Sequence, residues 1–175
     1  MKTIAKTLLL LLITTQSVNA ARTCEDYITD EWPDSRYTIQ SIIGDNVVTD
    51  NKTGLMWKQC GEGLSGADCL TGTLSTHTWQ QALAIPETLN ATGFAGFSDW
   101  RVPNIEELRS IAAINCYNPA INEVAFPNTP SLVFWSSSPV AGFPNGAWDV
   151  YFGDGGGGGN DRGFSNRVRL VRSGQ

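Results

Sequence analysis

The chain has little of what most catalytic and metal sites are built from. Its 175 residues include one histidine, His77, and four cysteines without a Cys-x-x-Cys pair. A zinc site needs several such ligands at close spacing, so the sequence argues against one. The glycine run 155–159 lacks the Gly-Lys-Ser/Thr end of a phosphate-binding loop. We therefore predict no catalytic residues, no metal and no cofactor, and expect a protein that is not an enzyme.

Long apolar runs are also missing after the first residues. Residues 1–20 combine two lysines, an apolar stretch at 8–13 and small residues before position 20. This pattern predicts a secretory signal peptide, because the stretch is too short to span a bilayer. We expect an exported protein of the periplasm, the cell surface or the medium, with no membrane insertion.

Basic residues are scarce in the 155 residues that follow, which fit one domain. Removing Lys2 and Lys6 leaves ten basic and seventeen acidic residues, a net charge of −7. This charge disfavours nucleic acid and anionic membrane surfaces as partners.

All four cysteines follow the signal peptide, and an even number in an oxidising compartment predicts two disulfides. Three pairings are possible. Cys60 with Cys69 would close a short glycine-rich loop, which leaves Cys24 to pair with Cys116. We expect this arrangement, in which residues 21–44 form an N-terminal segment tied to the domain by a disulfide.

The elements predict an α+β fold with small antiparallel sheets. Alternation and turn residues predict strands at 37–43, 47–50 and 55–59. Two capping boxes predict helix starts, one at Thr78 with Gln81 and one at Asn104 with Glu107. We expect Pro86 to limit or restart the first helix, and the second to run to about residue 114.

The segment 136–168, called the variable segment below, has an unusual composition. It lacks Lys, Glu, Gln, Met, Ile, Leu, Thr, His and Cys. Every residue type present except tryptophan can be reached from an AAC or AAT codon by changing only adenines. A flexible linker would not contain large aromatic residues such as Trp148, Tyr151, Phe152 and Phe164. The pattern indicates adenine-targeted mutagenesis of a surface that recognises changing partners. The alternative is chance composition in a glycine-rich hairpin.

Alternation along 147–152 predicts a strand with two different faces. Trp148, Val150 and Phe152 are expected in the core with Trp135, and the opposite side chains are expected to face outward. We predict one exposed binding face, with Tyr151 and Phe164 as its anchors. Its residues are Val140, Ala141, Phe143, Asn145, Asp149, Tyr151, Gly153, Asp154, Asn160, Asp161, Gly163, Phe164 and Ser165.

Three further features have competing interpretations. Residues 156–161 match one copy of a calcium-binding repeat that needs stacked turns. A calcium ion held by Asp154, Asp161 and carbonyl groups remains an alternative. The serines at 136–138 have no evident base beside them. Arg101 is interpreted as structural, paired with Asp99 or with a backbone carbonyl.

Several motifs together resemble the Lcl C-terminal domain family over about residues 45–172. They are the segments 50–57, 79–83, 93–108, 134–138 and 168–172, of which Gly-Phe-Ser-Asp-Trp-Arg-Val-Pro is the most specific. The resemblance implies a C-type-lectin-like fold of the branch shared with formylglycine-generating enzymes. The namesake of the family is the end domain of a collagen-like adhesin that binds sulfated glycans. The tail further resembles the variable region of proteins diversified by retroelements. Formylglycine-generating enzymes use a cysteine pair late in their domain. This chain has no cysteine after Cys116, so the resemblance does not imply that activity.

We therefore expect a recognition or adhesion protein that binds a protein or glycan on another cell or phage surface. One alternative is a glycan-binding adhesin, or an envelope or pilus module, without diversification. Another is an extracellular enzyme on a formylglycine-generating-enzyme-like fold.

Overall fold

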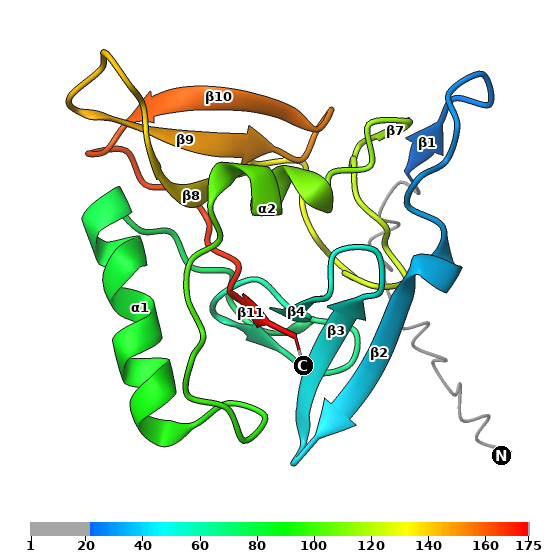
Figure 1. Cartoon of the computed structure of the whole chain (residues 1–175), viewed down its shortest axis with the longest axis horizontal. Helices are drawn as coiled ribbons and strands as arrows, with labels where there is room; N and C mark the ends of the chain where they lie inside the picture. Colours follow the sequence, from blue (N-terminus) through cyan, green and yellow to red (C-terminus); the bar gives the residue numbers. More distant parts are fainter. Residues whose placement is uncertain (1–21, 175) are drawn as a thin grey trace, which may run out of the picture.

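The computed structural model describes residues 22–174, and the predicted signal peptide, residues 1–20, lies outside that range. Two α-helices and several small antiparallel sheets are joined by long loops (Figure 1). The protein is therefore an α+β, loop-rich domain, as the sequence predicts.

A four-stranded antiparallel sheet holds the C-terminal end of the domain beside its first strands. Its order is β11–β4–β3–β2, and Val171 on β11 pairs with Trp57 on β4. The strands are β2 (Tyr37–Ile42), β3 (Asp45–Asp50), β4 (Leu55–Lys58) and β11 (Val171–Ser173). The first three follow the expected ranges. The pairing of β11 with β4 closes the domain (Figure 1).

A three-stranded antiparallel sheet carries most of the variable segment. Its strands are β8 (Val133–Pro139), β9 (Gly146–Tyr151) and β10 (Gly156–Asp161), with β9 in the centre. The β8–β9 register shifts between Trp135 and Pro139. In Figure 1 the β9–β10 pair lies at the top, above α2.

Both helices begin at the predicted capping boxes. Helix α1 (Trp79–Thr92) is capped by Thr78, and α2 (Ile105–Ser110) is capped by Asn104. Helix α1 continues through Pro86, which is buried. Helix α2 ends four residues earlier than expected, because the chain turns at Ile111 and the following residues join the core without helical geometry.

The core has two parts, one on each side of the three-stranded sheet. Phe134, Val150 and Phe152 pack with residues of α2 in the first part. Trp135 and Ala147 pack with Trp100 and residues of α1 in the second part. Because strand side chains alternate between faces, β8 and β9 contribute to both parts.

Both predicted disulfides are present, Cys24–Cys116 and Cys60–Cys69. The first joins β1 (Thr23–Cys24) to β7 (Cys116–Tyr117), which also pair as strands. The second closes the loop that contains β5 (Leu64–Ser65), which pairs with β6 (Thr71–Gly72) just after Cys69. The N-terminal segment is therefore attached to the loop that follows α2.

The predicted partner of Arg101 is wrong. Its guanidinium forms two 2.6 Å hydrogen bonds with the carboxylate of Glu107, the N3 residue of α2. Asp99 pairs instead with Arg172 on β11, at 2.7 Å and 3.2 Å. Glu107 lies within reach because its carboxylate already accepts the backbone N–H of Asn104. Arg101 therefore has a structural role, as expected, with a different carboxylate.

Candidate functional site

The prediction that Asp149 faces solvent is wrong, because β9 has core on both sides. Asp149 is only 3% exposed and lies directly opposite Trp135, which is fully buried. It shares a face of β9 with Ala147, another core residue. The sequence prediction assumed that one face of this strand is exposed to solvent, whereas a sheet can be covered on both faces.

The buried Asp149 carboxyl has too few hydrogen bonds to offset the cost of removing it from water. Its Oδ2 atom has no hydrogen-bond partner among residues 22–174. Burial raises the pKa of the Asp149 carboxyl above its ordinary value, and a hydrogen bond with Asn160 opposes that rise. Asp149 therefore belongs to the scaffold and not to the exposed face.

The prediction that Trp148 is buried is also wrong, since 36% of this residue is exposed. Its cross-strand neighbour on β10 is Gly159, which has no side chain to cover the indole. On the other side, β8 departs from regular register between Trp135 and Pro139. Trp148 therefore adds a large aromatic surface that the sequence prediction missed. The other predicted core residues, Val150 and Phe152, are fully buried with Trp135.

Most of the predicted face is accessible, with Gly153 as a second exception. Gly153 is buried because the Tyr151 ring lies directly over it, and a Cβ there would overlap the ring. Gly146 supports Phe143 in the same way. These glycines hold both aromatic rings against the backbone and leave them 40% and 39% exposed.

The predicted residues form two groups and not one continuous face. Tyr151 pairs with Gly156 at one end of the β9–β10 hairpin, and Gly146 pairs with Asp161 at the other. The five steps between them correspond to about 17 Å in an antiparallel strand. The first group is Tyr151, Gly153 and Asp154. The second is Val140, Ala141, Phe143, Asn145, Asp161, Gly163, Phe164 and Ser165. Asn160 lies between them and is half-buried.

The first group borders a hollow of about 490 Å³, called the N-terminal hollow below. The variable segment supplies Tyr151, Gly153 and Asp154. The rest of its wall comes from Glu25, Tyr27 and Ile28 beside β1 and from residues 114–118 around β7. The predicted Cys24–Cys116 disulfide brings the first two of these wall segments together. No sequence pattern indicates that the end of the β9–β10 hairpin lies beside them.

The second group adjoins a hollow of about 570 Å³ at the start of α1. The Arg162 guanidinium stacks on the Trp79 ring at 4.2 Å from the centroid, and its Nε donates to the carbonyl of Gly146. Phe164, 59% exposed, lies beside this turn through its N–H bond to the Asp161 carbonyl. Arg162 and Trp79 were not among the predicted site residues.

The two carboxylates considered for calcium do not lie together. Asp154 precedes β10 and Asp161 ends it, and each accepts a 2.8 Å bond from the backbone N–H two residues later. No group of three or more His, Cys, Asp or Glu side chains arranged for a metal occurs between residues 22 and 174.

Two of the serines at 136–138 hold the backbone in place through hydrogen bonds. Ser136 donates to the Trp148 carbonyl at 2.7 Å, and the Ser138 hydroxyl accepts the N–H of Ile105 at the start of α2. His77 contacts the hydroxyl of Ser75 at 2.8 Å.

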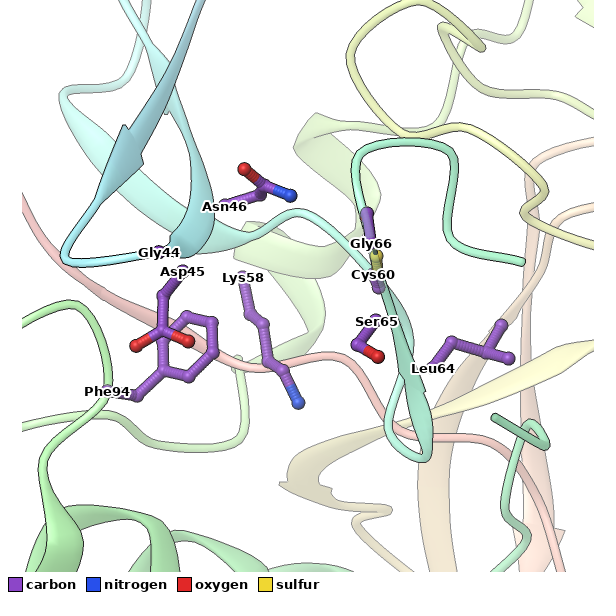
Figure 2. Close-up of a pocket in the computed structure, with 9 residues that line it drawn as sticks. All are labelled: Gly44, Asp45, Asn46, Lys58, Cys60, Leu64, Ser65, Gly66 and Phe94. Carbon is purple, nitrogen blue, oxygen red and sulfur yellow. Dashed lines mark hydrogen bonds between the residues drawn. The ribbon is translucent and has the colours of Figure 1, made fainter. Parts of the chain in front are cut away.

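A third hollow, of about 110 Å³, lies between the β2–β3 turn and the disulfide loop (Figure 2). Lys58 points into it between Phe94 and Ser65. Its ammonium lies 2.8 Å from Glu62 and 5.3 Å from the centroid of the Phe94 ring. Asp45 accepts the N–H of Ala95 at 2.7 Å. The charged groups therefore have partners already, and no residue of the predicted binding face lines this hollow.

These features define a disulfide-linked α+β domain with accessible aromatic side chains at both ends of one hairpin. The model of the Lcl C-terminal domain family matches residues 46–172. The chain therefore belongs to that family, and the match includes the whole variable segment. No curated protein matches the chain significantly. Among residues 22–174, no helix is long and apolar enough to cross a membrane.

Proposed function

We propose that this protein is an exported recognition protein whose variable segment binds a protein or glycan on another cell or phage surface. The observation that carries the proposal is the separation of side chains within one hairpin. Phe152 and Val150 are fully buried, whereas Tyr151, Phe164 and Phe143 are 40%, 59% and 39% exposed. Exposed aromatic rings among Ser, Gly and Asn are typical of binding surfaces that must adapt to different partners.

Binding is favoured over catalysis by the placement of the acids in the variable segment. Asp149 is buried, while Asp154 and Asp161 lie at opposite ends of β10. Their carboxyl groups do not converge on one point, as acid–base catalysis requires. This placement of the acids supports the proposal that the protein acts by contact and not by chemical conversion.

Export and the lectin-like fold are parts of the same proposal. Two disulfides are typical of proteins in oxidising compartments. The family resemblance supports a C-type-lectin-like backbone, in which a constant scaffold carries changing surface side chains. Retroelement-directed changes at adenines would account for the residue types of 136–168.

The display of variable residues is tested by thermal unfolding of a triple variant, Tyr151→Asn, Asp154→Ser and Phe164→Asn. We expect its Tm to stay within about 5 °C of wild type, because exposed substitutions each change stability little. Phe152→Asn is the matched control, since it alters a buried ring in the same hairpin. This control should lose roughly 3–5 kcal/mol. A triple variant as unstable as the control would refute the display surface.

Diversification has its own test in the flanking DNA. We expect a near-copy of codons 136–168 beside a reverse transcriptase gene, with differences only where the copy has adenine. A near-copy that differs equally at all four bases would exclude adenine-targeted change.

A further inference from the structure

The N-terminal hollow has a chemical character that neither the family nor the variable segment explains. Its exposed apolar lining includes Tyr27, Tyr117 and Tyr151, which are 82%, 39% and 40% exposed. The charged residues in its wall are Glu25 and Asp154, and no basic side chain within residues 22–174 lines it. Aromatic faces beside carboxylates form a favourable environment for an organic cation.

The polar groups in the same wall point to the same class of ligand. Glu25 and Asp154 contribute carboxylates, and Asn118 contributes an exposed side-chain amide. The hollow therefore combines hydrogen-bond acceptors with aromatic rings, and an N–H-rich cation supplies the complementary donors.

The wall is held in place before any ligand arrives. The N–H of Glu25 donates to the carbonyl of Asn115 at 2.8 Å, and the N–H of Asn118 donates to the carbonyl of Gly153 at 2.9 Å. The Cys24–Cys116 disulfide links the first two segments covalently. A preformed site loses less conformational entropy on binding.

We propose that the N-terminal hollow receives an arginine side chain of a partner protein. A guanidinium is planar, stacks on aromatic faces and carries five N–H donors, which suits three tyrosines and several acceptors better than a compact ammonium. The net charge of −7 without residues 1–20 also favours a basic partner surface. The inference rests on the proposed recognition function and names the chemistry that one end of the hairpin selects.

Part of this site lies outside the variable segment and part lies inside it. Tyr27 and Tyr117 lie outside the variable segment, whereas Tyr151 and Asp154 lie inside it. Substitutions at positions 151 and 154 would therefore change or remove the preference for arginine. Tyr27 and Tyr117 would stay in place and still offer aromatic surface to a ligand.

The test uses N-acetyl-arginine amide and its neutral isostere N-acetyl-citrulline amide as probes. Binding to the folded protein is followed by changes in backbone amide NMR shifts. We expect the arginine probe to shift the amides of Asn118, Gly153 and Asp154, with a dissociation constant on the order of 1–10 mM. The citrulline probe should bind at least about threefold more weakly, and added salt should weaken only the arginine probe.

Asp154→Asn and Asp161→Asn form a matched pair of variants. Each aspartate accepts a 2.8 Å bond from the N–H two residues later, and an asparagine Oδ1 can accept the same bond. We expect Asp154→Asn to weaken arginine binding by about three- to fivefold and Asp161→Asn to leave it unchanged. Equal effects of the two variants would overturn the proposal.

Other occupants of the hollow would give different results. Equal binding of the citrulline probe would overturn the proposal in favour of a neutral ligand such as a glycan. Shifts at the same amides that appear only on raising the protein concentration would assign the hollow to a second copy of the chain. If the triple variant keeps its Tm but wild type does not bind the arginine probe, the display surface stands and only this inference fails.

Discussion

At the scale of single residues, Asp149 shows how a predicted contact residue can belong to the scaffold. Its carboxyl lies opposite Trp135 inside the sheet, and its Oδ2 atom has no partner within residues 22–174. A buried polar group of this kind lowers stability unless it is protonated or hydrogen-bonded. The residue type is accessible by adenine changes, but accessibility of a codon does not establish exposure of a side chain.

The raised pKa of Asp149 predicts a pH dependence of stability with a defined sign. The unfolded carboxyl loses its proton near its ordinary pKa of about 3.9, while the folded carboxyl keeps it to higher pH. Between these two pKa values the unfolded state binds fewer protons, so the free energy of unfolding falls as pH rises. Asp149→Asn removes this contribution. We expect wild type to lose stability relative to the variant from pH 3 towards neutrality.

Urea unfolding of both proteins at several pH values checks this prediction. The difference between the two curves isolates Asp149, because Asp50, Asp99 and Glu107, whose pKa values are lowered by their arginine and hydrogen-bond partners, contribute equally to both. A difference independent of pH would show that Asp149 is not buried in the folded protein.

At the scale of elements, the parts that local chemistry determines were predictable from sequence. The capping boxes at Thr78 and Asn104 place both helix starts, since each side chain bonds to a backbone N–H three residues on. The cysteine spacing likewise indicates both disulfides. The faces of β9 could not be predicted, because burial of Asp149 depends on which strands and helices lie on either side. Those neighbours come from distant parts of the sequence.

The glycines of the run 155–159 differ in the backbone conformation and space that they need, and a pair of substitutions distinguishes them. A Cβ on Gly157 would make ordinary contacts at 3.6 Å and 3.7 Å, so Gly157→Ala should stabilise the strand by roughly 0.5 kcal/mol. Gly155 has a φ of +81° and a Cβ there would lie 3.2 Å from Ile114. Gly155→Ala should therefore destabilise the turn by about 1 kcal/mol or more. Thermal unfolding of the two variants measures both effects.

Opposite signs at positions 155 and 157 would show that only part of the glycine run is free to vary. Equal losses would mean that Gly157 is also required by the backbone and that this part of β10 does not tolerate a side chain.

At the scale of the whole molecule, the N-terminal segment and the end of the variable hairpin meet only because the chain folds back on itself. The Cys24–Cys116 disulfide spans 92 residues, while Cys60–Cys69 spans nine. No local sequence pattern places Tyr27 beside Tyr151, which is why the hollow could not be predicted. The long-range disulfide therefore contributes to both stability and the shape of the candidate site.

Removing each disulfide by paired Cys→Ser substitutions should separate these two contributions. In the chain-entropy account, the long loop is worth about 4.6 kcal/mol and the short loop about 2.6 kcal/mol, so the Cys24/Cys116 variant should lose more stability. At a temperature where both variants remain folded, binding of the arginine probe should weaken in the Cys24/Cys116 variant only, because only this bond positions the constant wall of the hollow. Equal weakening in the two variants would mean that general loosening of the domain, and not the position of that wall, controls binding. Unchanged binding in the Cys24/Cys116 variant would show that the strand pairing of β1 with β7 is sufficient to hold the wall.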